Sequence, residues 1–248
     1  MVTHQPHPYF AKLLTLVLDK TIDSHGPYQL REFSSAAEKE RIRKLLHEGR
    51  EISIIWSTTN PERESNLRAI PFALLKGLNE YRLLLIRKGE QARFATVENL
   101  ADLRSFTAGS GTHWQDSRIF EANQLPIVTS VRWDNLFAML EAGRFDYVAR
   151  GAYEVWQELL RPDFQTFELE QRLMLHYQAP YYFFVNRDNI ALAERVLAGL
   201  KLAVEDGSYD ELFFSHPPFA KGWQAVHSSK RVLIKLASPL GPPVTPPE

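Results

Sequence analysis

The chain has 248 residues, of which 44% are hydrophobic and 24% charged, the composition of a folded globular protein. Its 29 lysines and arginines nearly balance 30 aspartates and glutamates, so the net charge of −1 gives no reason to expect nucleic acid as a partner. Because there is no cysteine, a disulfide framework, a thiolate metal site and a cysteine nucleophile are excluded. The eight histidines have no ligand spacing, so neither a metal nor a cofactor is expected. No stretch predicts a membrane span, and residues 1–8 do not resemble a signal peptide.

The first part of the chain is predicted to alternate between helices and strands. Helices are predicted where apolar residues recur every three or four positions, and strands where a short apolar run is bounded by turn residues. In chain order these are a helix at 9–18, a strand at 28–33, a helix at 36–48, a strand at 51–57 and a strand at 81–87. The run at 51–57 is nearly continuous, which is typical of a strand inside a parallel sheet. It leads into a polar turn at 58–64, where Pro61 prevents simple continuation.

A second series follows the polar residues 88–93, which are the best candidate for a crossing between two lobes. Its predicted elements are a short helix at 97–103, strands at 105–108 and 125–130, a helix reaching about residue 122, a helix from Leu136 to Gly143, a strand at 145–149 and a helix at 153–160. The strand at 145–149 delivers Arg150 and Gly151 to its carboxyl end, where open α/β sheets place their ligands. The stretch therefore predicts a binding cleft.

The remainder of the chain is predicted to return to the first lobe. One or two strands at 164–173 are followed by an aromatic strand at 179–185, helices at 190–204 and 209–214, and a late strand at 232–236. Residues 239–248 contain five prolines, which favour an extended surface tail over a packed core.

Residues 109–114, with the sequence GSGTHW, form a glycine-rich turn between a predicted strand and a predicted helix. Such a turn exposes N–H groups at a helix N-terminus, which suits a phosphate or a carboxylate. It fails as a dinucleotide fingerprint because Trp114 stands where the third glycine is needed. No His and Asp pair can be assigned to Ser110, so a hydrolase is not indicated. A small anionic or polar ligand and a purely structural turn both remain open.

Arg63 and Arg150 each follow a predicted buried strand, in different halves of the chain. A guanidinium binds carboxylate or phosphate in a bidentate fork, so these arginines, with Thr58 and the helix end at Gly111, would suit an anion. The alternative is that each arginine is an ordinary surface or salt-bridged residue. Three aromatic residues are equally candidates for walls of the cleft and for the core: Tyr9, Trp56 and Trp114.

The order of these elements resembles the type II periplasmic solute-binding proteins, the family 3 extracellular receptors of bacterial amino-acid ABC transporters, as a divergent branch. The resemblance covers about Tyr9 to Phe214. It is carried, in order, by residues 52–63, 70–72, 81–89, 97–103, the segment LFAMLEAGRFDYV at 136–148, residues 181–185 and the helix ending at 206–209.

The resemblance implies an α/β fold of two lobes, each a mainly parallel sheet flanked by helices, joined by two hinge strands that allow closure on a solute. Lobe 1 would comprise residues 1–88 and 185–248, with a proline-rich tail at 237–248, and lobe 2 residues 89–184. It further implies a monomer without catalytic activity, located in the periplasm after removal of a signal peptide. The partners would be a small solute and the membrane permease of an ABC transporter.

The resemblance also implies roles for four residues. Thr58 and Arg63 would hold the α-carboxylate of the solute from the first lobe, and Gly111 and Thr112 would bind it from the second. Trp56 or Trp114 would form an aromatic wall, and Tyr9 is a further wall candidate.

Arg150 departs from the family pattern. Members that bind amino acids usually place an acid just after the strand ending near Ala149, where it holds the α-ammonium, whereas this chain has Arg150 and Gly151. Because an arginine repels an ammonium group, this departure favours an anionic or non-zwitterionic solute. Replacing Arg150 with alanine would then abolish binding of an anion.

Two other functions remain open. The same fold could serve as a ligand-sensing or partner-binding module, which the extension at 221–248 slightly favours. It could also be an enzyme, since relatives of this fold include cyclohexadienyl dehydratases and lytic transglycosylases. Glu64 and Glu154 are then the only candidates for a general acid near the cleft.

Overall fold

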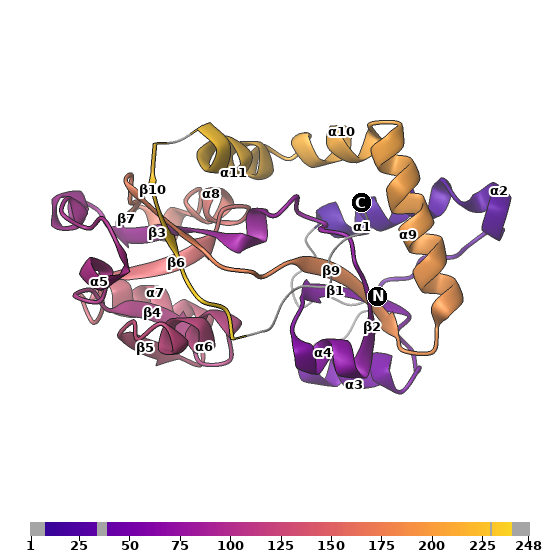
Figure 1. Ribbon diagram of the computed structural model, residues 1–248, viewed down its shortest axis with the longest axis horizontal. Helices are drawn as coiled ribbons and strands as arrows, with labels where there is room; N and C mark the ends of the chain where they lie inside the picture. Colours follow the sequence, from indigo (N-terminus) through magenta and orange to yellow (C-terminus); the bar gives the residue numbers. More distant parts are fainter. Residues whose placement is uncertain (1–7, 34–38, 229, 240–248) are drawn as a thin grey trace. The chain divides into compact units, whose positions relative to one another are not determined.

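The computed structural model describes residues 8–33, 39–228 and 230–239, and the chain divides into two compact units (Figure 1). Unit 1 comprises Met1–Gly77, Ala179–Pro217 and Pro242–Glu248, and unit 2 comprises Leu78–Gln178 and Pro218–Gly241. Within the described ranges, no helix is both long and apolar enough to span a membrane. Each unit has its own sheet with buried apolar side chains, which confirms the predicted mixed α/β fold.

The sheet of unit 1 has three strands in the order β1-β9-β2. They are β1 (Ile54–Thr58), β2 (Leu67–Ile70) and β9 (Tyr181–Asn186). β9 pairs antiparallel with both neighbours, and Thr58 lies opposite Tyr181. The apolar run at 51–57 had indicated a parallel neighbour. The ladders of unit 1 differ from that expectation because β9 lies between β1 and β2 and runs against both.

The helices of unit 1 pack against this sheet and against one another. They are α1 (Pro8–Asp19), α2 (Ile22–His25), α3 (Lys39–His47), α4 (Pro61–Asn66), α9 (Ile190–Glu205) and α10 (Ser208–Phe214). Ile42 and Leu46 of α3 join a buried cluster with Ile55 and Phe184 of the sheet. Residues 28–33, predicted as a strand, pair with no strand in the described chain, and the Tyr28 hydroxyl instead donates to the Asp19 carboxylate (2.6 Å).

α4 begins where the sequence predicted only a polar turn. The Asn60 side chain accepts a hydrogen bond from the Arg63 amide (2.7 Å), which caps the helix. Pro61 occupies the first helical position, where its missing N–H would have no partner within the helix. A helix therefore starts directly after β1 and carries Arg63 in its first turn.

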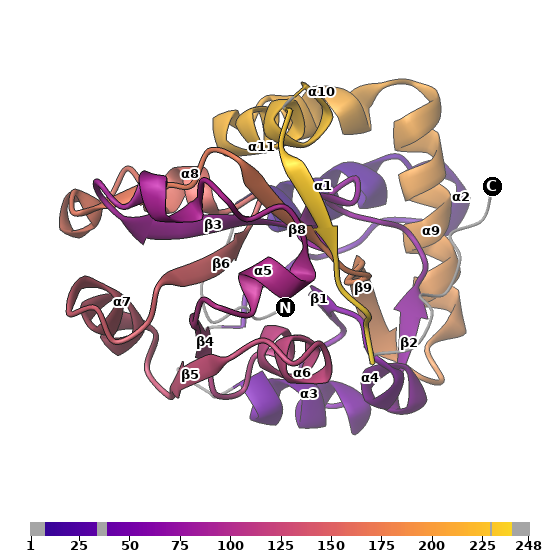
Figure 2. The ribbon, with the colours of Figure 1, turned by 60° about the vertical axis from the view of Figure 1, so that its left-hand side comes forward.

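Gly199 brings α9 into close contact with α1 (Figure 2). A Cβ atom at this position would lie 2.1 Å from the carbonyl oxygen of Val17. Because this oxygen belongs to the backbone, relieving the clash would require one of the two helices to shift. We expect Gly199→Ala to lower the free energy of unfolding by about 1–3 kcal/mol, the usual cost of overpacking. Urea unfolding would measure it. Alanine is favoured over glycine inside a free helix by about 1 kcal/mol, so a gain in stability would contradict the close contact.

The sheet of unit 2 has the order β10-β8-β3-β6-β4-β5, and β7 pairs with β3. Its strands are β3 (Tyr81–Arg87), β4 (Ala108–Gly111), β5 (Ile127–Ser130), β6 (Tyr147–Gly151), β7 (Phe167–Leu169), β8 (Leu173–His176) and β10 (Val232–Lys235). β4 is parallel to β5 and β6, and β10 is parallel to β8 at the edge of the sheet (Figure 2). β3 is antiparallel to β6, β7 and β8.

The helices of unit 2 include one that was not predicted. They are α5 (Leu100–Leu103), α6 (Gln115–Ala122), α7 (Trp133–Glu141), α8 (Val155–Glu158) and α11 (Pro217–Ser228), with short 3₁₀ turns at Leu78–Glu80, Gln91–Phe94 and Pro162–Phe164. The paired prolines at 217 and 218 lie in the first turn of α11, where proline is tolerated. α11 packs closely on unit 2, because a Cβ at Gly222 would lie 2.1 Å from the Ala152 carbonyl oxygen.

The chain passes between the units at other positions than the sequence had suggested. The divisions fall after Gly77, Gln178, Pro217 and Gly241, whereas the sequence had suggested divisions after residues 88 and 184. Residues 88–93, expected to be a crossing, lie inside unit 2, as do residues 218–241. Of the expected proline-rich tail, residues 240–248 lie outside the described residues.

Candidate functional site

In unit 1, Thr58 and Arg63 come from consecutive elements. Thr58 is the last residue of β1 and is half-buried. The Arg63 side chain is only 9% exposed, and its guanidinium carbon lies 5.8 Å from the centre of the Phe184 ring. The neighbouring Thr59 hydroxyl donates to the Glu64 carboxylate. The two residues predicted to hold a carboxylate therefore lie at the carboxyl end of β1 and in the helix that follows it.

Tyr9 and Trp56, which the sequence offered equally as walls of a site and as core residues, are buried in unit 1. Tyr9 is fully buried, and its hydroxyl donates to the carbonyl oxygen of Leu74 (2.8 Å). Trp56 is also buried and stacks on Phe10 at 5.2 Å between ring centres. Their burial follows from their positions on the inner faces of α1 and β1.

In unit 2, Arg150 lies inside β6 and its charge is already paired. The side chain is 8% exposed. Its Nε and Nη2 atoms donate to the Glu158 carboxylate at distances between 2.6 and 3.1 Å, and Nη2 lies 3.2 Å from Glu154 Oε1. The guanidinium carbon also lies 4.9 Å from the Trp114 ring centre. The Arg150 guanidinium, which the sequence suggested would bind an anionic solute, is therefore already bound by the carboxylates of Glu154 and Glu158.

The directions in which the pKa values of Arg150 and Glu158 are shifted agree with this ion pairing. Burial opposes the charge of Arg150, but Glu154 and Glu158 outweigh burial and raise its pKa above the ordinary value. Burial raises the pKa of Glu158, and the charge of Arg150 only partly opposes that rise. One guanidinium faces two carboxylates, so the position that seemed cationic in the sequence carries no excess of positive charge.

The first three residues of the glycine-rich segment, 109–111, belong to strand β4, and the turn follows them. Gly111 ends β4, and the Trp114 indole lies so close that a Cβ on Gly111 would be 2.4 Å from it. The Thr112 amide donates to the Ser130 carbonyl oxygen (3.0 Å), so it is used within the sheet, while the Thr112 side chain is exposed. Trp114 is half-buried between Gly111 and Arg150 and stays a candidate wall.

Gln115, which the sequence did not single out, is the first residue of α6. Both polar atoms of its side chain are buried and have no hydrogen-bond partner among the described residues. Because a buried amide without a partner costs about 1–3 kcal/mol, Gln115 is a candidate to pair with a bound solute. No sequence motif marks it.

A second buried polar cluster lies beside this helix. Asp116 accepts hydrogen bonds from Arg82 Nε (2.8 Å) and from the Tyr177 hydroxyl. Burial alone would raise the pKa of Asp116, but the Arg82 guanidinium and the Tyr177 hydroxyl together hold it below its usual value. Sequence reasoning missed these residues because 34 positions separate Arg82 from Asp116 and 61 separate Asp116 from Tyr177.

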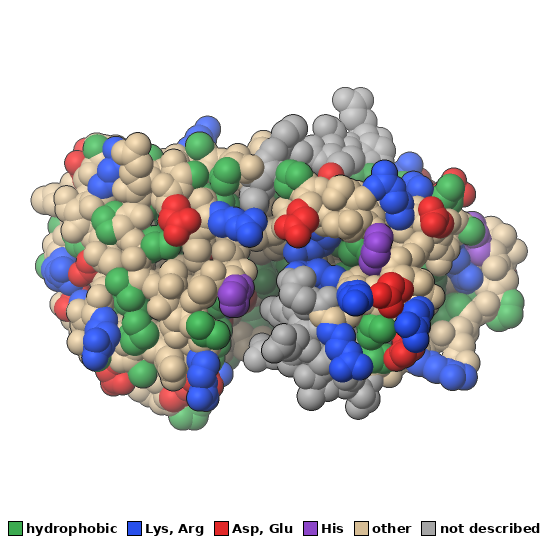
Figure 3. Space-filling view, turned by 90° about the horizontal axis from the view of Figure 1, so that it is seen from below, with side chains coloured by type: hydrophobic (Ala, Val, Ile, Leu, Met, Phe, Trp, Pro, Cys, Tyr) green, Lys and Arg blue, Asp and Glu red, His purple; other side chains and the backbone are tan. Residues whose placement is uncertain are grey.

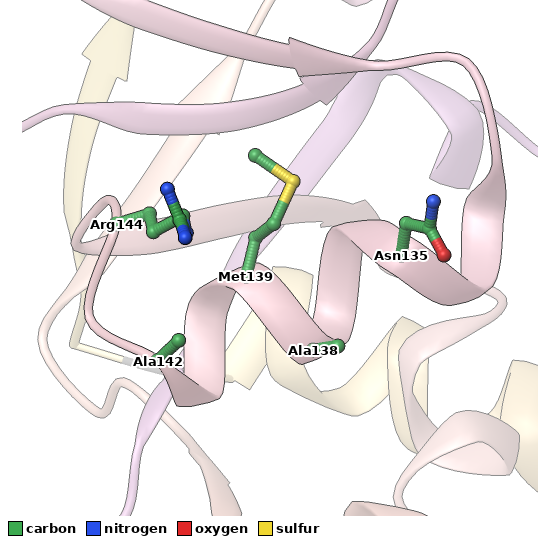
Figure 4. A pocket seen from close by; sticks show the side chains of 5 residues that line it. All are labelled: Asn135, Ala138, Met139, Ala142 and Arg144. Atoms are coloured by element: carbon green, nitrogen blue, oxygen red, sulfur yellow. The ribbon is translucent and has the colours of Figure 1, made fainter.

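Other surfaces of the described chain show fewer features of a binding site. A shallow hollow of about 390 Å³ lies on α7 and the turn after it, lined by Asn135, Ala138, Met139, Ala142 and Arg144 (Figure 4). Acidic and basic side chains are interspersed on the face shown in Figure 3. Among the described residues, no three His, Asp or Glu side chains are grouped to hold a metal ion.

No family model and no curated protein matches the sequence, but solved structures match most of the chain. An arginine-specific periplasmic binding protein of Salmonella typhimurium matches with a TM-score of 0.58 at 15% identity, over 84% of this chain and 88% of that chain. An amino acid ABC transporter substrate-binding protein of Streptococcus pneumoniae, bound to L-arginine, matches with a TM-score of 0.59 at 14% identity, over 86% of this chain and 84% of that chain. An ancestral amino-acid-binding protein, a precursor of cyclohexadienyl dehydratase, has a TM-score of 0.60 at 13% identity, over 84% of each chain.

The chain therefore has the two-lobed α/β fold of the type II periplasmic amino-acid-binding proteins, as the resemblance in its sequence predicted. At identities of 13–15% the likeness defines the fold. The solute has to be argued from the residues of this chain.

Proposed function

We propose that the protein is a non-catalytic receptor that binds a small amino-acid-like solute and passes it to the permease of an ABC-type transporter. The fold supports this proposal, because the structures it resembles include an arginine-specific periplasmic binding protein and an amino acid ABC transporter substrate-binding protein. A periplasmic location is part of the same proposal.

The pairing of Arg150 supports an ammonium-bearing solute in place of an anion. Two carboxylates face one guanidinium, so acidic side chains outnumber the basic one in this group of three. Glu154 is the more accessible acid, with 28% of its side chain exposed, and its Oε1 atom is held by the Gly151 amide (3.0 Å) and by Arg150. A carboxylate that is fixed in this way is suited to accept a charge-assisted hydrogen bond from an ammonium group.

Further candidate contacts lie near Glu154 in unit 2. In unit 2, the Trp114 ring would form a wall and the Gln115 side chain would gain a polar partner, with Gly111 and the exposed Thr112 hydroxyl alongside them. Within unit 1, Thr58 and Arg63 are the candidates to bind a carboxylate.

A thermal-shift panel tests the class of solute. We expect one or more of the standard L-α-amino acids to raise the melting temperature, because a ligand that binds only the folded state adds about 2.7 kcal/mol at 100 times its Kd. Dicarboxylates and phosphate esters without an amine serve as the comparison. A shift produced by these anions alone would contradict the proposal, and no shift at all would favour a sensing or partner-binding module.

Glu154→Gln tests the assigned acid with the α-amino acid that gives the largest shift in that panel. The change keeps the size of the side chain and removes its charge, so we expect about tenfold weaker binding or more, since a hydrogen bond to a charged group contributes about 1.5–3 kcal/mol. Glu121→Gln, on the exposed side of α6, is the control. Equal affinities of the two variants in calorimetry would remove Glu154 from the site.

A further inference from the structure

Arg82, Asp116 and Tyr177, called here the coupling cluster, connect three separate parts of unit 2. Asp116 Oδ1 receives both Arg82 Nε and the Tyr177 hydroxyl. Arg82 Nη1 donates to the Asn79 carbonyl oxygen, and the guanidinium carbon lies 4.9 Å from the Tyr177 ring centre. Arg82 is 6% exposed and Tyr177 is 1% exposed, so water hardly competes for these contacts.

The cluster reaches two of the places where the chain passes between the units, those after Gly77 and after Gln178. Asn79 is the second residue of unit 2 after Leu78, and Tyr177 is the last but one before the chain leaves at Gln178. The backbone joins these two places as well, because the Tyr177 amide donates to the Glu80 carbonyl oxygen (3.1 Å). Asp116 lies in the first turn of α6, directly after Trp114 and Gln115.

One acid at the start of α6 is thus hydrogen-bonded to both connecting segments. Arg82 also occupies a central strand, paired with Gly151 of β6 and Leu175 of β8. A buried polar network of this kind behaves as a unit, because each bond orients the next and an unpaired member is costly. A shift of the α6 start therefore disturbs Asp116 and, through it, both segments.

We propose that the coupling cluster transmits changes at the start of α6, where the solute is proposed to bind, to the segments at Asn79–Arg82 and Leu175–Gln178. Arg82, Asp116 and Tyr177 are positioning residues in this assignment and do not contact the solute. The inference rests on the proposed function only for the claim that a solute binds at the start of α6. The effect of a change there on the two segments can be measured without a solute.

Hydrogen exchange read by mass spectrometry on the full chain tests the transmission. Trp114→Leu perturbs the start of α6, and exchange is compared in peptides covering residues 78–84 and 174–180. The comparison is repeated in a Tyr177→Phe background, which removes only the hydroxyl that reaches Asp116. Tyr147→Phe is the matched control, because the Tyr147 hydroxyl is buried without a hydrogen-bond partner among the described residues.

We expect Trp114→Leu to change exchange in both peptides by about twofold or more in the wild-type and Tyr147→Phe backgrounds. In the Tyr177→Phe background the change should persist in residues 78–84, where Arg82 still binds Asp116, and be lost in residues 174–180. Unchanged exchange in the wild-type background, or an equal change of residues 174–180 in the Tyr177→Phe background, would overturn the assignment. A purely structural role would alter the melting temperature of Tyr177→Phe without removing the response to Trp114→Leu. In a second measurement, the L-α-amino acid with the largest thermal shift should produce the same pattern. If no amino acid binds, the proposed function fails while the exchange response to Trp114→Leu still decides the coupling.

Discussion

Arg150→Ala is expected to lower the free energy of unfolding of unit 2 by about 3–5 kcal/mol, because removing one partner of a buried ion pair leaves its charge uncompensated. Glu158 would lose its three hydrogen bonds from the guanidinium, and Glu154 would face Glu158 without a cation between them. The Trp114 ring would also lose the guanidinium beside it. Chemical denaturation, followed by tryptophan fluorescence and circular dichroism, would measure the loss.

Two further variants separate this explanation from a direct role in binding. Arg150→Ala combined with Glu158→Ala should recover part of the lost stability, because neighbouring charges that act as a pair are not additive. Arg118→Ala, at an exposed position of α6, should change stability by no more than about 0.5 kcal/mol. If Arg150→Ala is as stable as Arg118→Ala and loses binding of an anion, the arginine is a ligand residue, as the sequence had suggested.

Glu170→Ala should be comparably damaging, at about 3–5 kcal/mol. The Glu170 side chain is fully buried and accepts hydrogen bonds from the amides of Arg172 and Leu173 and from the Gln91 side chain. Arg231 lies 3.7 Å away, and burial already lowers the pKa of this arginine. Removing the carboxylate leaves several buried donors and one cation without their partner.

Glu168→Ala, two residues earlier, provides the control, because this half-buried side chain accepts one hydrogen bond, from the exposed Gly89 amide (2.8 Å). A loss of at most about 1 kcal/mol is expected there. Since Arg231 directly precedes β10, Glu170→Ala should also speed hydrogen exchange in β10, where Val232 pairs with Leu173. Equal stability of the two variants would show that Glu170 does not anchor this segment.

Elements with a strong local pattern were predicted from the sequence nearly as the structure has them. α1, β3 and α9 each have an unambiguous apolar period, and their bounds agree closely with the prediction. β4 was displaced by three residues because Gly109 reads as a turn residue, whereas in the structure the Phe145 ring occupies the space of its missing Cβ. The pairing of β9 between β1 and β2 depends on contacts across more than a hundred residues, which a local pattern does not contain.

The candidate site was predicted only in part for the same reason. The sequence placed Arg150 at the carboxyl end of a buried strand, as an anion-binding residue or a surface or salt-bridged one, and the structure shows it buried and salt-bridged. Its partner Glu158 lies eight residues away on α8, and the predicted helix at 153–160 did not show which of its side chains would reach Arg150. Asp116, Arg82 and Tyr177 had no signal in the sequence, because each becomes significant only through the others.

Titration calorimetry of the full chain with each standard L-α-amino acid tests the central claim most directly. The account predicts saturable binding of one molecule of at least one amino acid, with a Kd well below about 1 mM, which corresponds to more than about 4 kcal/mol of binding free energy. Heats no larger than dilution for every amino acid, together with saturable binding of a dicarboxylate or phosphate ester, would contradict it.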